Sequence, residues 1–462
     1  MRTDFNVKLG FAPTRRNLFC RKEPARYKGI VQSALKDMNV DMADIDWLNE
    51  EGLLFDCADI ERVAQHFISE RIDALFVPHC NFGSEDAVVR LARRLGKPVL
   101  LWGPRDDAPL PDGMRLRDTQ CGLFATGKAL RRYGVPFSYI ENCRVSDDAF
   151  SSGLSAFLGA ACAVKAFGNM RIGQIDTRPQ GFLTMMIDEG ALLERFGIEV
   201  IPINLSELLD VVKKIQEERA EFITEEITRI RSILNCSAIA DEKLGTMAAL
   251  KQAIKEWSER EGLSAVAIQC WNALQDQTGI APCFVNSELT EEFLPVSCET
   301  DIHGAVTSIL TQSLARGISP IFFADITVRH PENDNGELLW HCGPFPHSLK
   351  KPGTVSSISP HYILDSACPG VNEWEIKGGD MTICRFDGDG GAYKVLAAKC
   401  RGIDGPVTRG TYVWVEFEDL PRLERKLVCG PYVHHVAGIH ANIIPALTEF
   451  VRFVPGIELD LA

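Results

Sequence analysis

The sequence predicts an α/β protein with two Rossmann-like parallel-sheet domains, followed by a β-rich, antiparallel, barrel-like C-terminal domain. Over the first third of the 462 residues, short apolar runs alternate with helical patterns, and this alternation restarts near residue 168. From about residue 330, strand-like runs separated by Gly, Asp and Pro replace it. Strands that alternate with helices indicate right-handed βαβ units, whereas consecutive strands with tight turns indicate antiparallel pairing. The expected domains are residues 1–168, 169–328 and 329–462.

The individual elements follow from apolar periodicity and turn residues, taken in chain order. The first domain has predicted strands at 7–12, 72–80 and 97–103, and helices around 27–38 and 85–95. The second has predicted strands at 171–176, 197–203, 264–271, 293–299 and 318–327, a helix at 185–196, two long helical patterns after residue 203, and a helix at 306–315. The third has predicted strands at 381–386, 393–400 and 411–417, and a closing helix at 442–453.

Charge and cysteine usage narrow the class of protein. Acidic residues outnumber basic ones, 63 to 49, and the formal charge of −14 would repel a phosphate backbone, so no nucleic-acid partner is expected. No apolar run approaches the roughly 18 uninterrupted residues typical of a membrane span, so no membrane partner is expected. The fifteen cysteines include no Cys-x-x-Cys pair. With no signal-like segment at the start, the sequence indicates reduced thiols and a cytoplasmic location.

Polar side chains gather where predicted strands end, and four of them suggest a metal site. These are Glu299, Asp325, His341 and His435. Two carboxylates and two imidazoles form a mixed oxygen and nitrogen set that suits a divalent ion such as Mn²⁺. Each residue also has a simpler explanation: a lone acid can cap the next helix, and a histidine can be a hydrogen-bonded core residue. The pair His434 and His435 can split by strand alternation, with one side chain inward and one outward.

Four motifs, spread over nearly the whole chain, resemble the L-fucose isomerase and L-arabinose isomerase superfamily, in its shorter fucose-isomerase-like branch. They are "CETDIHGAVT" at 298–307, "PHCNFGSED" at 78–86, "WHCGPFPHSL" at 340–349 and "HHVAGIHANIIPALTEFVRFVPGIEL" at 434–459. The resemblance implies that Glu299, Asp325 and His435 are metal ligands, with His341 a fourth. It also implies a homo-oligomer, a trimer or hexamer, in which "PHCNFGSE" of one subunit reaches the metal of the next.

The resemblance implies an aldose–ketose isomerase that moves a proton between C1 and C2 of a sugar through an ene-diol. A metal that binds both oxygens would stabilise the developing charge, and Glu299 and Asp325 would serve as acid and base. Asp301 and His303 would then orient ligands or cap the next helix rather than ligate directly. Two alternatives stay open: a cytoplasmic sugar-binding or sensing protein, and a metal-dependent hydrolase or lyase of a sugar derivative.

The substrate is expected to be a neutral L-fucose-like or L-arabinose-like aldose first, and an anionic sugar such as a sulfo-sugar second. Arg15, Arg16 and Arg178 follow predicted strands and could grip an anionic group by bidentate contacts. Taken singly, each arginine could equally be a solvated or subunit-bridging residue. Two further expected substrate contacts are His79 and Asn81.

Overall fold

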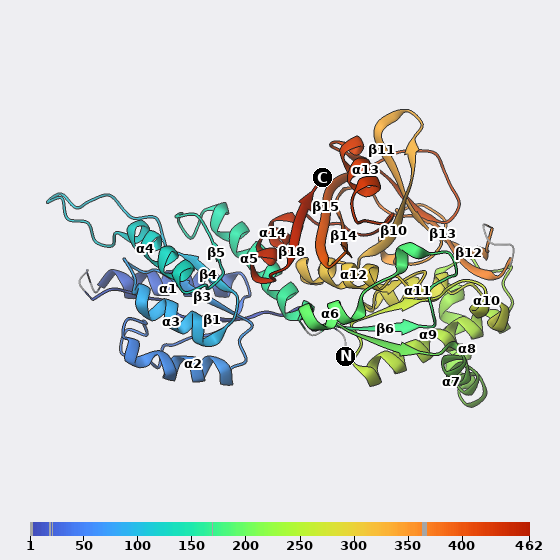
Figure 1. The fold of residues 1–462 in the computed structure, drawn as a ribbon, viewed down its shortest axis with the longest axis horizontal. Helices are drawn as coiled ribbons and strands as arrows, with labels where there is room; N and C mark the ends of the chain where they lie inside the picture. The colour runs from blue at the N-terminus through green and yellow to red at the C-terminus, as the bar shows by residue number, and fades with distance from the viewer. Residues whose placement is uncertain (1–2, 18–19, 21, 169, 363–366) are drawn as a thin grey trace. The chain divides into compact units, whose positions relative to one another are not determined.

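The computed structural model describes residues 3–17, 20, 22–168, 170–362 and 367–462, and these form two compact units (Figure 1). The N-terminal unit contains residues 5–165 and 445–455. The large unit contains residues 166–444, the chain's first residues up to Asp4, and Gly456–Ala462. Asn169, where the second domain was expected to begin, lies outside the described residues. The three-domain division stays a prediction, and residues on both sides of the expected boundary at 328 belong to the large unit.

The N-terminal unit is a parallel sheet with helices on both faces. Its strands have the order β2-β1-β3-β4-β5. They are β1 (Lys8–Phe11), β2 (Asp41–Ala43), β3 (Ala74–Pro78), β4 (Val99–Trp102) and β5 (Phe137–Tyr139). Leu75 and Val77 of β3 pack into one apolar cluster, and the alternate residues Ala74 and Phe76 pack into a second. A strand buried on both faces is the pattern expected of a parallel sheet covered by helices.

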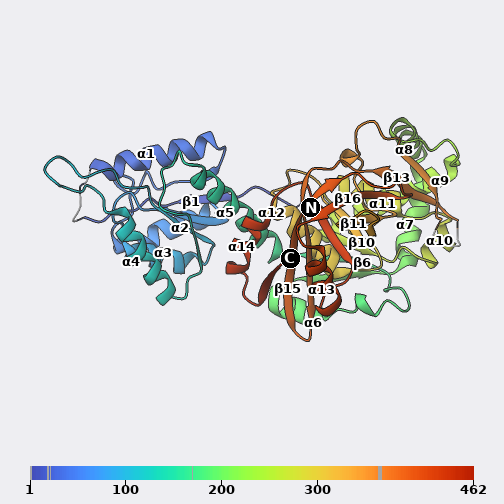
Figure 2. The ribbon, with the colours of Figure 1, turned by 90° about the horizontal axis from the view of Figure 1, so that it is seen from above.

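The helices of this unit divide between those two clusters (Figure 2). On one face lie α1 (Lys22–Asp37) and α5 (Asp148–Phe167); on the other lie α2 (Ile60–Ser69), α3 (Glu85–Leu95) and α4 (Thr119–Arg132), preceded by the short helix η1 (Cys57–Asp59). The helix α5 is the one described helix long and apolar enough to cross a membrane by length and composition, a test that core helices also pass. Phe150 and Phe157 of α5 are buried in the cluster that α1 shares, which is the environment of a core helix.

The helix α14 (Ile444–Phe453) was expected to close the C-terminal domain. Residues 445–455 instead group with the N-terminal unit, and Phe453 packs against Phe157 with ring centroids 6.2 Å apart. The reason lies in its apolar side chains: Phe453 packs against the core cluster to which α5 contributes. The periodicity predicted the helix correctly, but it carries no information about which core the helix covers.

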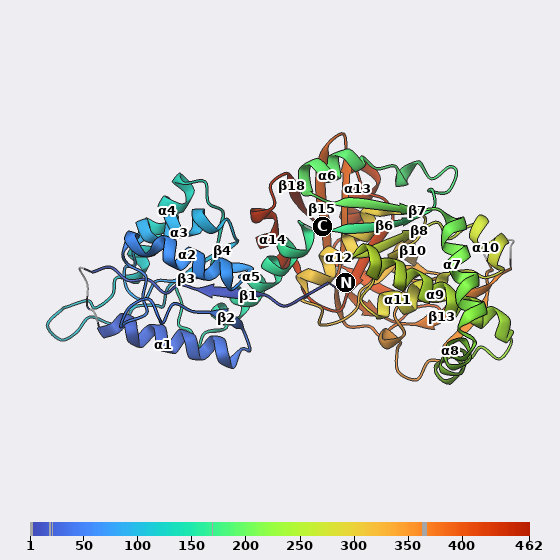
Figure 3. The same cartoon turned by 90° about the horizontal axis from the view of Figure 1, so that it is seen from below.

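The large unit begins with a second parallel sheet, of order β7-β6-β8-β9 (Figure 3). Its strands are β6 (Arg171–Ile175), β7 (Glu199–Ile203), β8 (Ala265–Ile268) and β9 (Val296–Ser297). The helices are α6 (Glu189–Phe196), α7 (Leu205–Glu218), α8 (Ala220–Ile233), α9 (Asp241–Glu261), α10 (Ala273–Thr278), α11 (Cys283–Glu291) and α12 (Ile302–Leu314), with a short helix η2 (Leu183–Met185). Every residue of α12 is buried. This helix therefore lacks a polar face, and its sequence reads as a continuous apolar and small-polar run.

The second sheet of the large unit has nine strands in the order β12-β13-β16-β11-β10-β17-β14-β15-β18. They are β10 (Phe322–His330), β11 (Asn333–His341), β12 (Ser357–Pro360), β13 (Pro369–Glu375), β14 (Asp380–Asp389), β15 (Ala392–Ile403), β16 (Thr411–Phe417), β17 (His435–Ile439) and β18 (Ile457–Leu461), with helices η3 (His347–Leu349) and α13 (Leu420–Cys429). A further pairing of β15 with β16 closes six of the strands into a barrel that is antiparallel throughout. The predicted fold class is confirmed.

One strand prediction is wrong in its placement. The run at 318–327 was expected to extend the second parallel sheet, but β10 pairs antiparallel with β11 and β17 in the barrel. Asp325 therefore lies within a strand rather than after one. A buried apolar strand looks the same in both kinds of sheet, so only the pairing decides between them.

Candidate metal and substrate site

The four predicted metal ligands come from four separate segments and converge in the large unit. Asp325 of β10 lies directly opposite His435 of β17, and His341 ends β11, the neighbour of β10 on its other side. Glu299 lies in the loop between β9 and α12. Three ligands thus stand on adjacent barrel strands, and the fourth comes from the carboxyl edge of the parallel sheet, where ligand sites of α/β sheets form.

The distances place these side chains in two overlapping groups that share His435. Glu299 Oε2 lies 3.5 Å from His435 Nε2 and 4.0 Å from His341 Nε2. Asp325 Oδ1 lies 3.3 Å from His435 Nε2. Ligand atoms of Glu299, His341 and His435 all lie within 4.8 Å of one another, and so do those of Asp325, His434 and His435. Ligands bound to a common cation have separations of this order.

The turn that carries Glu299 has an unusual backbone. Glu299 and Thr300 have φ angles of 54° and 57°, in the left-handed region that non-glycine residues seldom adopt. Thr300 is held by a bond from its N–H to Ile268 O of 3.1 Å and a bond from its hydroxyl to Thr177 O of 3.3 Å. Such a conformation persists only where surrounding structure fixes it, and it is found more often at functional sites.

Behind the ligands, Asp301 holds His435 in place. His435 Nδ1 donates to Asp301 Oδ2 at 2.8 Å, which leaves Nε2 directed at Glu299 and Asp325. Asp301 also accepts from the N–H of Gly304 at 2.8 Å and so caps α12. The expected helix cap is confirmed, and the bond to His435 agrees with the expected role of Asp301 in orienting a ligand. A carboxylate that accepts from the far nitrogen of a ligating histidine fixes its tautomer and orientation.

Asp301 in turn forms a buried ion pair with Arg385. The guanidinium contacts both carboxylate oxygens through Nη1 and Nη2, the latter at 3.1 Å, and its Nε donates to Asp387 Oδ2 at 2.8 Å. His303 Nδ1 then donates to the other oxygen of Asp387 at 2.9 Å. Burial acts to raise the pKa of Asp301, but the charge of Arg385 and the bond from His435 hold it well below its usual value. Asp301 is therefore a permanent anion behind His435.

Sequence reasoning missed Arg385 and Asp387, although a signal for them exists. In the run "MTICRFDG", Ile383, Arg385 and Asp387 alternate along one face of β14, so two opposite charges share a face with an apolar residue. Charges that a strand directs inward are usually paired. The segment "DGDGG" spans residues 387–391. The structure forms a β14–β15 hairpin there, with both Gly390 and Gly391 at positive φ.

The predicted ligand residues suit a divalent ion, and the surroundings of the two carboxylates support this. Within the described part of the chain, the buried atoms Glu299 Oε2 and Asp325 Oδ1 have no hydrogen-bond partner. Burial and the nearby Cys270 raise the pKa of Glu299 well above its usual value, and burial raises that of Asp325 to about 6 despite the opposing charge of His435. Buried anionic oxygens without donors are unfavourable alone and are stabilised by a cation. This group of residues can therefore hold a metal ion.

The two histidines next to each other in sequence have separate environments. His435 is 1% exposed, whereas the side chain of His434 is 47% exposed and its Nε2 lies 3.9 Å from Asp325 Oδ1. Burial lowers the pKa of His435, but the bond to Asp301 and the charge of Asp325 outweigh it, so the net shift is upward. His341 is 2% exposed, and burial together with the charge of His435 lowers its pKa well below the usual value. His341 is thus neutral and available as a ligand.

Four of the five predicted substrate residues lie in the N-terminal unit, where its strand order reverses. Arg15 and Arg16 follow β1, and His79 and Asn81 follow β3, the strand beside it. Ligands in sheets of order 2-1-3-4-5 bind where the loops after these two strands meet. Asn81 Oδ1 accepts from the N–H of Arg16 at 2.8 Å, which ties the two loops together.

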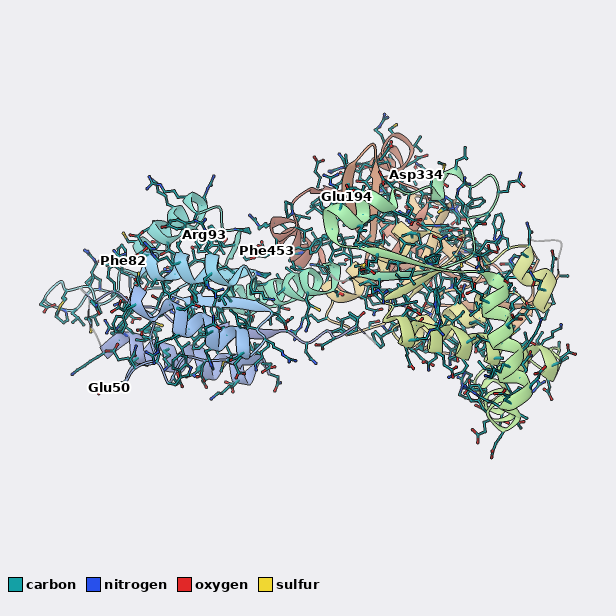
Figure 4. All side chains as sticks on the ribbon, turned by 60° about the horizontal axis from the view of Figure 1, so that its bottom comes forward. Glu50, Phe82, Arg93, Glu194, Asp334 and Phe453 are labelled. Carbon is teal, nitrogen blue, oxygen red and sulfur yellow. The ribbon has the colours of Figure 1, made fainter. Side chains whose placement is uncertain are left out.

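Several of these side chains already have protein partners. The Arg15 guanidinium bonds to Glu51 and Asn17 and lies 3.8 Å from the Phe55 ring centroid. The Arg16 guanidinium donates to Gly83 O at 3.0 Å and lies over the ring of Phe82, which is labelled in Figure 4. These contacts favour a structural role for Arg15, which is 3% exposed, and leave Arg16 half-buried.

His79 is a core residue of this loop. It is fully buried, and burial lowers its pKa to about 3, so its ring is neutral. A Cβ on Gly83, which has a φ of 77°, would lie 1.6 Å from His79 Nδ1. Only glycine permits this approach, which indicates that the ring and the loop pack as one unit.

Arg178, the fifth predicted substrate residue, lies in the large unit in the loop after β6. It is half-buried, and its Nη1 donates to Phe182 O at 3.4 Å. The adjacent residue Thr177 accepts the bond from Thr300, so this loop is joined directly to the turn that carries Glu299. Among the three arginines, Arg178 therefore lies in the same unit as the predicted metal ligands, and its loop is bonded to the turn that carries Glu299.

Comparisons with known proteins find similar sequences over most of the chain. Residues 10–168 match the sequence model of the family described as "Fucose/sulfoquinovose isomerase, N-terminal domain". A sulfoquinovose isomerase of Alkalicoccus urumqiensis is 27% identical over 406 residues, which cover 85% of this chain and 87% of that protein. One of Priestia aryabhattai is 26% identical over 390 residues, with 83% and 84% covered. Residues 10–168 therefore resemble the N-terminal domain of fucose/sulfoquinovose isomerases, and the chain is similar to sulfoquinovose isomerases over most of its length.

Proposed function

We propose that this protein is a metal-dependent aldose–ketose isomerase that acts on a sulfo-sugar of the sulfoquinovose type. The observation that carries the proposal is the convergence of Glu299, Asp325, His341 and His435, with two buried carboxylate oxygens that lack donors among the described residues. Moving a proton between C1 and C2 needs groups that change protonation near neutral pH, and negative charge on two sugar oxygens must be stabilised. The converging side chains meet both needs.

The ion would be held by Glu299, Asp325 and His435, with His341 as a fourth ligand, and Mn²⁺ suits this mixed oxygen and nitrogen set. When bound, a divalent ion stabilises the negative charge that develops on the two sugar oxygens. Asp301 and Arg385 keep His435 in the tautomer that leaves Nε2 free to bind. Cys270 Sγ, 3.6 Å from Glu299 Oε1, restrains the other carboxylate oxygen of that residue.

The proton transfer falls to the carboxylates. Asp325, whose carboxylate lies 3.3 Å from His435 Nε2 in the buried site, can accept a proton and return it. Glu299, whose Oε2 lies 3.5 Å from the same nitrogen, is the second candidate for this role. A proton removed from C2 of the aldose by one of these oxygens and delivered to C1 gives the ketose. A second proton must also move from the O2 hydroxyl to O1, and the other carboxylate can carry it.

The substrate proposed here is an anionic sugar, whereas the sequence motifs alone put a neutral aldose first. The matched relatives are sulfoquinovose isomerases, and they align over most of both chains. Arg178 offers a guanidinium on the loop that bonds to the Glu299 turn. A planar guanidinium pairs with the oxygens of an anionic group through two parallel bonds. We infer that Arg178 contributes to recognition of the sulfonate, with Arg16 as a further contributor.

The assembly and the compartment are also proposals. We infer a homo-oligomer, a trimer or hexamer, in which the loop at 78–85 of one subunit completes the site of another. Exposed aromatic side chains of the N-terminal unit, such as Phe124 at 66% exposure, support such contacts. Fifteen cysteines, all with free thiols, support a reducing compartment such as the cytoplasm. Light scattering that gave a fully active monomer would overturn the assembly.

The function is tested with the purified full-length protein, stripped of metal and then supplied with Mn²⁺. Sulfoquinovose, glucose, L-fucose and L-arabinose are incubated in D₂O, and products are identified by NMR. Formation of the corresponding ketose, with solvent deuterium at C1 and dependence on added metal, is the expected result. Binding without turnover would instead indicate a sensing protein, and fragments or new functional groups would indicate a hydrolase or lyase. Either outcome would reject the isomerase.

A further inference from the structure

Beside the isomerase site lies a group of soft ligands that the proposed reaction does not use. Cys283 is the first residue of α11, and Cys342 directly follows β11, yet their sulfur atoms are only 3.3 Å apart. A ring nitrogen of His361 completes the group, in which all three ligand atoms lie within 4.8 Å of one another. Cys283 and His361 are buried, and Cys342 is half-buried. We call this group the thiol site.

We propose that the thiol site binds one thiophilic cation, of the class of Zn²⁺ or Cd²⁺, separately from the ion of the isomerase site. Two thiolates and one imidazole are a ligand set that soft and borderline ions prefer, and the group contains no carboxylate. Thiolates about 2.3 Å from a tetrahedral ion stand about 3.8 Å apart. The sulfur atoms therefore need to separate by only a fraction of an ångström. Binding releases two thiol protons to solvent, and water takes the fourth position.

The surroundings of the thiol site suit this role. Cys283 and its neighbours Ala281 and Val371 form a small buried apolar cluster, against which Cys342 and Tyr362 pack. An apolar shell limits the access of water and strengthens bonds between an ion and its thiolates. Cys283 begins the nine-residue helix α11, and the contact with Cys342 together with burial raises the pKa of its thiol, so a bound cation must displace the proton.

The thiol site adjoins the isomerase site at Cys342, which follows His341 in the chain and contacts its ring. The Cys342 thiol contacts His341 Nδ1 at 3.5 Å, and His341 Nε2 faces Glu299 at 4.0 Å. A cation that takes up the sulfur of Cys342 removes this contact and frees the His341 ring to turn. Occupancy of the thiol site is therefore expected to lower turnover without displacing Mn²⁺. This second effect rests on the proposed function, whereas binding of the cation does not.

A second pair of thiols, Cys270 and Cys298, provides a comparison that tests where the cation binds. Cys270 and Cys298 also gather near an acid, but that acid is Glu299, so a cation held there would occupy the isomerase site itself. Such a cation would compete with Mn²⁺, whereas one in the thiol site would not. The two groups share no residue, so single substitutions separate them.

The experiment titrates the reduced, Mn²⁺-loaded full-length protein with Cd²⁺. It follows the ultraviolet thiolate-to-cadmium charge-transfer band and measures both metals after dialysis. Wild type is compared with two variants of the thiol site, Cys283→Ser and Cys283→Ala, of which the alanine keeps the apolar character of the cluster. Cys298→Ser tests the other pair of thiols, and Cys400→Ser is a control at a buried cysteine of β15. We expect wild type to bind one Cd²⁺ per chain and to retain its Mn²⁺. Only the two Cys283 variants should lose the charge-transfer band and that Cd²⁺. Activity assayed in parallel should fall with Cd²⁺ in wild type and not in the Cys283 variants.

Three results would overturn the proposal. The first is wild-type Cd²⁺ binding in Cys283 variants whose unfolding temperature is unchanged. The second is loss of Cd²⁺ in Cys298→Ser alone, and the third is release of one Mn²⁺ for each Cd²⁺ bound. Because the band and the metal content do not depend on a sugar, the proposal survives or fails independently of the isomerase activity.

Discussion

The carboxylate of Asp301 offers the sharpest test of how the protein prepares its metal ligands. In Asp301→Asn the side chain keeps its shape and can still cap α12, but it loses its charge. Two interactions weaken as a result: the 2.8 Å bond from His435 Nδ1 and the bidentate pair with Arg385. His435 is then less firmly held in the tautomer that directs Nε2 at Glu299 and Asp325.

The expected magnitude follows from burial and from the position of Asp301 behind a ligand. Loss of a hydrogen-bonded partner of a ligating histidine lowers metal affinity about 10- to 100-fold, or roughly 1.4–2.7 kcal/mol. Stability also falls, because the side chains of Asp301 and Arg385 are 2% and 1% exposed. Removing one member of a buried pair costs about 3–5 kcal/mol, and we expect the lower end because Asp387 still neutralises Arg385.

Isothermal titration of the metal-stripped protein with Mn²⁺ measures the affinity, and thermal unfolding without metal measures the stability. Asp387→Asn is the matched control, since Asp387 contacts the same guanidinium and His303 but not His435. We expect both variants to lose stability and only Asp301→Asn to lose Mn²⁺ affinity. Equal Mn²⁺ affinities in wild type and both variants would refute the view that Asp301 positions a ligand.

Three further predictions concern the same site. Glu299→Gln should abolish turnover and reduce bound Mn²⁺, because it removes a charged ligand; near-normal activity of this variant, measured with its metal content, would defeat the assignment. His435→Ala should lower Mn²⁺ affinity strongly and His434→Ala weakly, since only His435 is buried against the carboxylates; equal losses in titrations of both variants would contradict this. In the metal-free protein, the raised pKa of Asp325 means that its carboxyl favours folding below its unfolded pKa of 3.8 and loses this contribution as pH rises towards about 6. Asp325→Asn should therefore gain stability relative to wild type over that range, by at most about 3 kcal/mol, and Mn²⁺ should restore wild type; unfolding curves with no pH-dependent difference would oppose the burial argument.

A last prediction tests recognition of the anionic group. Arg178→Ala should lower kcat/KM for sulfoquinovose by about 30-fold or more, which corresponds to roughly 2 kcal/mol or above for an unpaired charge, and should barely change it for a neutral sugar. Arg15→Ala serves as the comparison, because that guanidinium is already bonded to Glu51 and Asn17. A small and parallel loss on both sugars would assign Arg178 to structure and return the neutral aldose to first place.

Local pattern was enough to predict the fold class and most of the elements. The helix Glu85–Leu95 has the bounds that its apolar spacing predicts, and the strands at 171–176 and 197–203 form where β-branched runs meet turn residues. The candidate ligands were also chosen from the sequence, because Glu299 and His435 lie in motifs that resemble those of a known family. These features depend on residues close together in the chain, which a sequence displays directly.

Tertiary structure alone decided how distant residues meet. No periodicity reveals that β10 pairs with β17, which places Asp325 opposite His435 across more than a hundred residues of chain. The same holds for the bond between Asp301 and His435, the Arg385 pair behind it, and the contact of Cys283 with Cys342. Burial and the burial-driven pKa of Asp325 also follow from packing. The physical reason is that strand pairing and desolvation depend on which surfaces meet in the folded chain, whereas the sequence records only which residues are neighbours along it.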